Sequence, residues 1–142
     1  MQQAEFDNKK NPISTEEKVK LLAEAAADKK AEFLKIYITS ELCSYADYIA
    51  IASANSERHA LSIADEVLHR AKRNGLLPLG TEGLNHGQWI LLDFGDIIFH
   101  IFNHPVRLYY ELDRFWGEAP QFQLENVTYP YPLPLETEGE EE

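Results

Sequence analysis

The segment from Gly87 to Phe102 constrains the fold most, because it predicts two strands folded back on each other with apolar side chains on both faces. Side chains along a strand alternate between the two faces of a sheet. The core of a small domain covers only one of those faces unless helices or a partner cover the other. The hairpin therefore points to an interaction surface.

The turn of this hairpin is expected at Phe94-Gly95, since glycine relieves a tight turn and the flanking aspartates tolerate turn geometry. In that register Trp89 faces His100 and Leu91 faces Ile98. The opposite face then carries Ile90, Leu92, Ile97, Phe99 and Ile101. A phenylalanine at positive φ is strained, so a longer loop is the alternative. A slip of one residue would break this assignment of faces.

Length and charge restrict the class of protein. The 142 residues suffice for one domain, expected at 13–120 between a flexible N-terminal segment, 1–12, and a Pro-rich, acidic tail, 121–142. The formal charge is −11, but residues 117–142 hold seven glutamates and no Lys or Arg, which leaves 17 acidic and 13 basic residues, or −4, elsewhere. Phosphate repels an acidic body, so dominant nucleic-acid binding is disfavoured and a basic protein partner is favoured.

Three further features predict a soluble, cytoplasmic protein without a membrane segment. Cys43 is the only cysteine and has no internal disulfide partner. No apolar run approaches the roughly 20 residues that cross a bilayer. The N-terminal residues 1–12 are polar and unlike a signal peptide.

Capping patterns and periodicity predict the helices. Ser14 and Glu17 form a capping-box pattern, and the helix that follows is expected to end at about Lys29 or Lys30. A second, long helix is expected from an N-cap at Ser56 to a stop at Gly75. After the hairpin, a final helix is expected to begin at Pro105 and to end at Gly117.

Alternation predicts the remaining strands, at Phe33–Thr39, at Tyr48–Ala52 and, on a sheet edge, at Leu79–Glu82. The alternation of the first strand indicates one face covered by a core. Residues 40–47 fit either a helical turn or a shaped loop. This order of elements predicts an α+β, or mixed α/β, fold in which helices flank a mixed β-sheet.

Candidate catalytic and metal sites are weak. Asp93-Phe94-Gly95 matches a protein-kinase triplet, but a Gly-rich loop and a His-Arg-Asp loop are both missing from the sequence. Asp93 and Asp96 flank a turn and do not project together from one strand, whereas a hard cation needs several converging oxygen ligands. The five histidines and Cys43 fit neither a zinc motif nor a catalytic triad. The helix start at Arg58-His59 fits either an anion site or a solvated first turn.

Trp89 is the strongest candidate for a binding residue. Leu91, Ile98, His100 and Phe102 are expected on its face, with Glu82 and the Asp93/Asp96 turn around them. An apolar centre with an acidic rim suits a partner whose apolar patch is framed by Lys and Arg.

Five motifs occur along the chain in a recognisable order. They are Asp47-Tyr48; Ser56-x-Arg58-His59; Gly75-Leu76-x-Pro78-x-Gly80-x-Glu82-Gly83; Trp89-x-Leu91-Leu92-Asp93-x-Gly95-Asp96 with His100 and Phe102; and Arg107-x-Tyr109-Tyr110-x-Leu112-x-x-x-Trp116. With them the chain resembles the ribosomal silencing factors, also called Iojap-like proteins, from about Ile13 to Pro120. The resemblance implies binding to the large ribosomal subunit through ribosomal protein number fourteen, which blocks joining of the small subunit. It also implies a nucleotidyltransferase-like fold and a capacity to form homodimers.

The sequence lacks the catalytic apparatus of nucleotidyltransferases. Their Gly-Ser helix start is replaced by Ala54-Asn55-Ser56, and no Asp-x-Asp or Asp-x-Glu pair follows on a strand. We therefore expect a steric translation inhibitor without catalytic residues, metal or cofactor. Its expected partner-binding residues are Glu82, Trp89, Leu91, Asp93, His100 and Phe102. The alternatives are a divergent nucleotidyltransferase-like enzyme and a dimeric adaptor.

Overall fold

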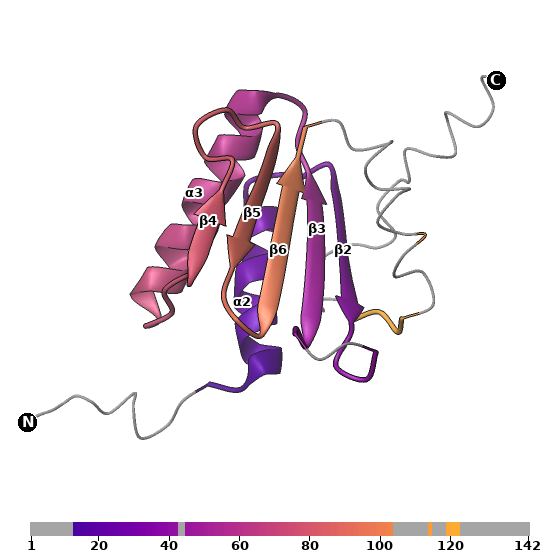
Figure 1. Cartoon of the computed structure of the whole chain (residues 1–142). Coiled ribbons are helices and arrows are strands. Elements are labelled where there is room, and N and C mark those ends of the chain that lie inside the picture. The colour runs from indigo at the N-terminus through magenta and orange to yellow at the C-terminus, as the bar shows by residue number, and fades with distance from the viewer. Residues whose placement is uncertain (1–12, 43–44, 104–113, 115–118, 123–142) are drawn as a thin grey trace, which may run out of the picture.

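The computed structural model describes residues 13–42, 45–103, 114 and 119–122, and this part of the chain forms a sheet with two helices on one face (Figure 1). The helices are α2 (Thr15–Asp28) and α3 (Glu57–Arg73). The strands are β2 (Phe33–Ile38), β3 (Tyr48–Ser53), β4 (Gly80–Glu82), β5 (Trp89–Asp93) and β6 (Ile97–Phe102). No helix within these residues is both long and apolar enough to cross a membrane.

The described strands form one five-stranded sheet in the order β2-β3-β6-β5-β4. β3 and β6 are parallel, and every other neighbouring pair is antiparallel. The predicted mixed sheet is therefore confirmed. β4 forms one edge, as the Pro and Gly residues around Leu79–Glu82 predicted.

The boundaries of the first two predicted helices are also confirmed, to within two residues. The Ser14 hydroxyl accepts the Glu17 N–H at 3.1 Å, and the Glu17 carboxylate accepts the Ser14 N–H at 3.2 Å, so the capping box is complete. Ser56 caps α3 by accepting the His59 N–H at 3.0 Å, and Gly75 follows its end with a φ of +78°. Residues 40–42 form a turn, in which the Leu42 N–H donates to the Thr39 carbonyl at 2.9 Å.

The main core lies between the sheet and the helices. α2 contributes Val19, Leu22 and Ala26, and α3 contributes Ala60, Ala64 and Val67. The strand residues that face them are Leu34, Ile36, Ala50, Ala52, Ile90, Leu92, Ile97, Phe99 and Ile101. This apolar face supplies the largest part of the burial that stabilises the described fold.

The other face of the sheet is also largely buried. Its cluster is Phe33, Tyr37, Ala46, Ile49, Ile51, Phe102 and Ala119, with Ile98 packed against them. The expectation that β2 is covered on one face only is wrong, since Tyr37 is completely buried. The segment 119–122 runs beside β2, where the Ile38 N–H donates to the Pro120 carbonyl at 2.7 Å and the Phe122 N–H to the Ile36 carbonyl at 3.0 Å.

The hairpin of β5 and β6 has a different register from the predicted one. Leu91 pairs with His100 and Trp89 with Phe102, and the turn residues are Gly95 and Asp96. Gly95 has a φ of +94°, which suits the first position of a type II′ turn and spares Phe94 that strain. The predicted register is wrong by two residues, and because side chains alternate with period two, the predicted faces are retained.

Several earlier expectations lie wholly or partly outside the described residues. These are the flexible N-terminal segment 1–12, the part of the loop 40–47 at residues 43–44, the final helix from Pro105 to Gly117 except for Arg114, and most of the tail 121–142.

The loop between β4 and β5 sets the position of Trp89. The carbonyl of Gly83 accepts N–H groups from His86 at 3.2 Å and Gly87 at 3.0 Å, which closes the loop on itself. A Cβ atom at Gly83 would collide with the carbonyl oxygen of Trp89, and Gly83 has a φ of +83°. Glycine is therefore required at this close approach.

We predict that Gly83→Ala lowers the free energy of unfolding by at least about 2 kcal/mol, because strain at positive φ adds to the backbone collision. Urea unfolding followed by far-UV circular dichroism measures the loss. Gly80→Ala is the matched control, since a Cβ there meets no atom within 4 Å. Equal stability of the two variants would contradict the predicted collision.

Candidate partner-binding face

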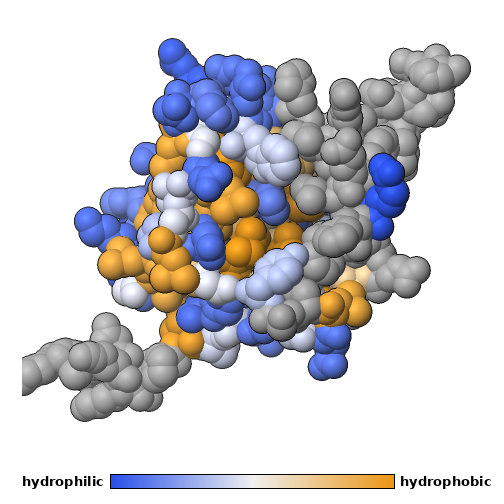
Figure 2. All heavy atoms as spheres, viewed as in Figure 1, coloured by the Kyte–Doolittle hydropathy of each residue, from blue (hydrophilic) through white to orange (hydrophobic). Residues whose placement is uncertain are grey.

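The face of the sheet opposite the helices carries an exposed tryptophan. Trp89 is 42% exposed, and it borders a hollow of about 450 Å³. The residues that line this hollow are Glu82, Gly83, His86, Gln88, Trp89 and Leu91. Figure 2 shows apolar side chains gathered over the centre of this face, with hydrophilic residues around them. We call Glu82, Trp89, Leu91, His100 and Phe102 the Trp89 face.

Two neighbours on β6 fix the indole ring. Its Nε1–H donates to His100 Nδ1 at 3.1 Å, and the two ring centroids lie 5.9 Å apart. Trp89 also meets Phe102 edge to face, with centroids 6.3 Å apart and an interplanar angle of 86°. The exposed ring is thus held in one orientation, which lowers the entropy that a partner would have to remove on binding.

His100 is neutral in this arrangement. Burial lowers its pKa from 6.5 to about 4, because the apolar surroundings disfavour the charged imidazolium. As a hydrogen-bond acceptor, Nδ1 must be unprotonated, so the ring proton resides on Nε2. Protonation of Nδ1 would remove the acceptor that orients Trp89.

The six predicted contact residues differ in their accessibility. Glu82 and Trp89 are exposed, whereas Leu91 and Asp93 are partly buried. His100 is 9% exposed and Phe102 is fully buried, so both lie beneath the surface and support Trp89. Cross-strand pairing places Glu82 beside Leu91 and Leu91 beside His100 in one row.

The structure adds three polar residues that the sequence did not identify. His86 and Gln88 line the hollow, and the Gln88 side-chain amide donates to the Glu57 carboxylate at 3.2 Å. Glu57 thereby joins Glu82 near the hollow. The only feature of the sequence that could have indicated these three residues is the pair of glycines at 83 and 87. They mark a tight loop that brings the start of α3 close to β5.

The two turn aspartates point to different partners. Asp93 accepts the Gly95 N–H at 2.9 Å, whereas Asp96 accepts from Lys18 at 3.1 Å and from the Thr15 hydroxyl at 3.2 Å. Their carboxylates have structural roles in the turn and in its attachment to α2. No group of three or more His, Cys, Asp or Glu side chains within the described residues is arranged to hold a metal ion.

The histidine at the start of α3 also has a structural role. His59 Nδ1 accepts the Asn55 N–H at 3.0 Å, and Nε2 lies 2.8 Å from the carbonyl oxygen of Lys29 at the end of α2. Both ring nitrogens are occupied, so His59 links the two helices. The arrangement supports the solvated first turn of α3 over an anion site.

We predict that His100 makes the protein less stable in acid. The unfolded chain takes up a proton near pH 6.5, whereas folded His100 stays neutral down to about pH 4. The unfolded state therefore binds more protons in this window, and the free energy of unfolding falls with falling pH by about 3 kcal/mol. Urea unfolding at neutral pH and between pH 6.5 and 4 measures this loss.

His100→Gln keeps an acceptor for the indole N–H and removes the titrating group, so the acid loss should become smaller. His69→Gln, at an exposed position of α3, is the control and should retain the wild-type dependence. An unchanged pH dependence in His100→Gln would show that His100 is not the responsible group.

Comparisons with known proteins identify relatives of this chain. Residues 12–141 match the family described as "Ribosomal silencing factor during starvation". A ribosomal silencing factor RsfS from Halalkalibacterium halodurans is 35% identical over 115 residues, which cover 81% of this chain and 98% of that protein. RsfS from Bacillus subtilis is 35% identical over 107 residues, or 75% of this chain and 91% of that protein.

The fold has a close counterpart among solved structures. A crystal structure of a protein from Chromobacterium violaceum superimposes with a TM-score of 0.70 and 29% sequence identity, covering 87% of this chain and 99% of that one. The family match spans nearly the whole chain and includes the hairpin with Trp89. The chain therefore belongs to the ribosomal silencing factor family, as its motifs indicated.

Proposed function

We propose that this protein represses translation by binding the large ribosomal subunit through ribosomal protein number fourteen and sterically blocking the small subunit. The observation that carries the proposal is Trp89, a large aromatic residue exposed on an apolar sheet face in a member of this family. The relatives from H. halodurans and B. subtilis are named as ribosomal silencing factors, which supports the same role here.

The Trp89 face has the physical properties of a binding hot spot. Tryptophan is enriched among residues that dominate binding energy, and such residues lie in pockets from which water is excluded. Trp89 is already oriented by His100 and Phe102, so little side-chain entropy is lost on docking. In the proposed complex, Trp89 and Leu91 make the apolar contact.

Acidic residues beside the hollow favour a basic partner. Glu82 and Glu57 lie next to it, and Asp93 is partly accessible on the same sheet face. Charges of this kind increase the rate of encounter with a protein rich in Lys and Arg and help to fix its orientation. Glu82 and Asp93 are the proposed contacts to such residues, while His100 and Phe102 support the apolar centre from below.

The proposed mechanism requires occupancy of a surface and involves no catalytic step. The alternative, a nucleotidyltransferase-like enzyme, would need free polar groups at its site. Asp96 and His59 are already engaged in structural hydrogen bonds, which disfavours them as catalytic groups. We further propose that the protein acts in the cytoplasm, that its fold is nucleotidyltransferase-like, and that it can form a homodimer. These three points rest on the family resemblance.

We predict that Trp89→Ala weakens binding to large ribosomal subunits by about 2 kcal/mol, or roughly 30-fold in Kd. Co-sedimentation with purified large subunits at a series of protein concentrations measures the change. Leu42→Ala is the control, because Leu42 is 55% exposed near the opposite edge of the sheet and should bind normally. Circular dichroism establishes that both variants are folded.

The same proteins then test the functional step. Small subunits are added, and the formation of joined ribosomes is followed by sedimentation. Wild type and Leu42→Ala should block joining, whereas Trp89→Ala should permit it. Normal ribosome binding by a folded Trp89→Ala variant would remove this face from the interface. A wild type that neither binds large subunits nor blocks joining would refute the proposed function itself.

A further inference from the structure

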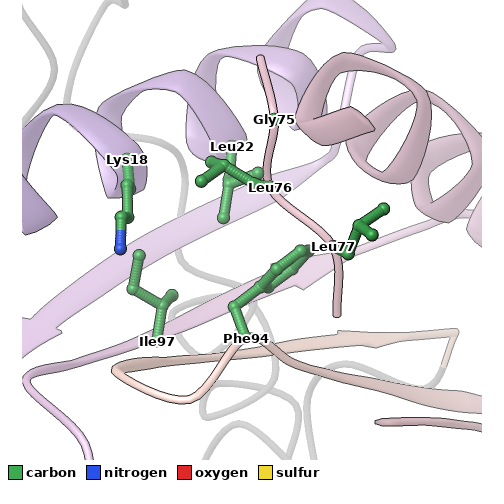
Figure 3. A pocket seen from close by; sticks show the side chains of 7 residues that line it. All are labelled: Lys18, Leu22, Gly75, Leu76, Leu77, Phe94 and Ile97. Carbon is green, nitrogen blue, oxygen red and sulfur yellow. The ribbon is translucent and has the colours of Figure 1, made fainter. Parts of the chain in front are cut away.

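A second apolar surface lies at the other end of the hairpin. A pocket of about 200 Å³ is formed by Lys18 and Leu22 of α2, by Gly75, Leu76 and Leu77 after α3, and by Phe94 and Ile97 of the hairpin. Figure 3 shows Lys18 and Leu22 reaching from α2 toward Ile97 and Phe94, with Leu76 beside them. We call this pocket, together with the neighbouring Leu79, the Leu77 surface.

The Leu77 surface carries two large apolar side chains that are mostly exposed. Leu77 is 67% exposed and Leu79 is 76% exposed. The Leu79 N–H donates to the Asp93 carbonyl at 2.7 Å, so this segment is attached to β5 and holds its leucines in place. Fixed, exposed leucines beside an apolar pocket indicate a docking surface.

The pocket has the size of one side chain. Pockets for small ligands usually measure about 300–1,000 Å³, so a volume near 200 Å³ is too small for that class. One leucine or tyrosine from a peptide would fill it, while Leu77 and Leu79 contact the adjoining residues. The geometry therefore favours a peptide segment.

The charges beside the pocket favour an acidic peptide. The last turn of α3, which precedes Gly75, contains Arg70, Lys72 and Arg73. Arg70 is paired with Asp28 at 2.8 Å and with Glu66 at 2.7 Å. Lys72 and Arg73 make no ion pair within the part of the chain that the structure describes. Lys18 is already paired with Asp96, so the available positive charge is on Lys72 and Arg73.

The segment 119–122 ends within reach of this surface, although it runs antiparallel to β2 and therefore away from the end of the sheet that holds Ile97. The ring of Phe122 packs edge to face against Tyr48, with centroids 6.1 Å apart. Tyr48 pairs with Ile97 across the parallel strands, and Ile97 lines the pocket. From the segment beside β2, the pocket wall on β6 is three strand spacings away, roughly 14 Å. Residues 123–128 can span roughly 20 Å when extended.

The residues after Phe122 have the required composition. Apolar residues occur at Tyr129, Tyr131, Leu133 and Leu135, and five glutamates follow within residues 136–142. Residues 123–142 contain no Lys or Arg. A short tether holds such a segment at an effective concentration on the order of millimolar, so even a weak contact is occupied.

We propose that the Leu77 surface is the docking site of the chain's own C-terminal segment, residues 123–142. One apolar side chain between Tyr129 and Leu135 fills the pocket, and the glutamates that follow lie toward Lys72 and Arg73. The acidic segment is thereby held at the end of the hairpin away from the Trp89 face. This docking does not depend on ribosome binding.

Paramagnetic broadening in the full-length protein tests this docking. Cys43→Ser removes the native thiol, and Thr137→Cys places a nitroxide label among the terminal glutamates. We predict that the amide signals of Gly75, Leu77 and Leu79 lose most of their intensity, whereas that of Leu84, at the other end of β5, is unaffected. In the matched control, Tyr129, Tyr131, Leu133 and Leu135 are all replaced by serine in the labelled chain, and the lost intensity should return.

Two results would overturn the proposal. One is equal broadening at Leu77 and Leu79 with and without the apolar tail residues, since a tether alone would then explain the effect. The other result concerns a mixture of two kinds of chain. One kind carries the isotope label but no nitroxide, and the other carries the nitroxide but no isotope label. Broadening of the same strength in this mixture would assign the contact to the tail of a second copy. Binding to large ribosomal subunits is measured on the same variants. A failure of the tail to dock is thereby distinguished from a failure of the proposed function.

Discussion

The fold depends on the burial of β6 on both faces. Ile97, Phe99 and Ile101 point toward the helices, while Phe102 and most of His100 are buried on the other side. β6 also pairs with β3 in parallel and with β5 in antiparallel orientation, so it joins the two halves of the sheet. Because both faces of β6 carry apolar side chains, the second face needs its own cover. Toward β2 that face has an apolar cluster that includes Ala119, and toward β5 it has the ring of Trp89.

The hydrogen bond from Trp89 to His100 joins this architecture to the proposed function. A buried histidine normally costs stability, but here its Nδ1 accepts the one polar group of the indole. The indole is thereby satisfied on its inner edge and can present an apolar ring to solvent. A phenylalanine at position 100 would fill similar space and leave the indole N–H without that acceptor. The polar pair within an apolar face thus sets the orientation of the exposed side chain.

The elements that sequence alone predicted are those determined by neighbours along the chain. Ser14 with Glu17 and Ser56 with Gly75 fixed the helix ends through local hydrogen bonds, and the alternation in β5 and β6 fixed their faces. The register was missed by two residues, because it depended on which turn position places Gly95 at positive φ. The burial of Tyr37 was missed because its apolar cluster includes Ala119, about 80 residues later in the chain. The burial of Phe102 and the approach of Gln88 to Glu57 likewise depend on tertiary contacts.

The two apolar surfaces have opposite charges beside them, and this difference determines which segments each can accept. Glu57 and Glu82 lie near the Trp89 face, whereas Lys72 and Arg73 lie near the Leu77 surface. An acidic tail is repelled from the first and attracted to the second, although both surfaces offer apolar contact. Since a tethered tail searches the whole molecule at high effective concentration, charge is what keeps it from occupying Trp89. A chain with a formal charge of −11 can thus carry a long acidic segment and still present an open site to a basic partner.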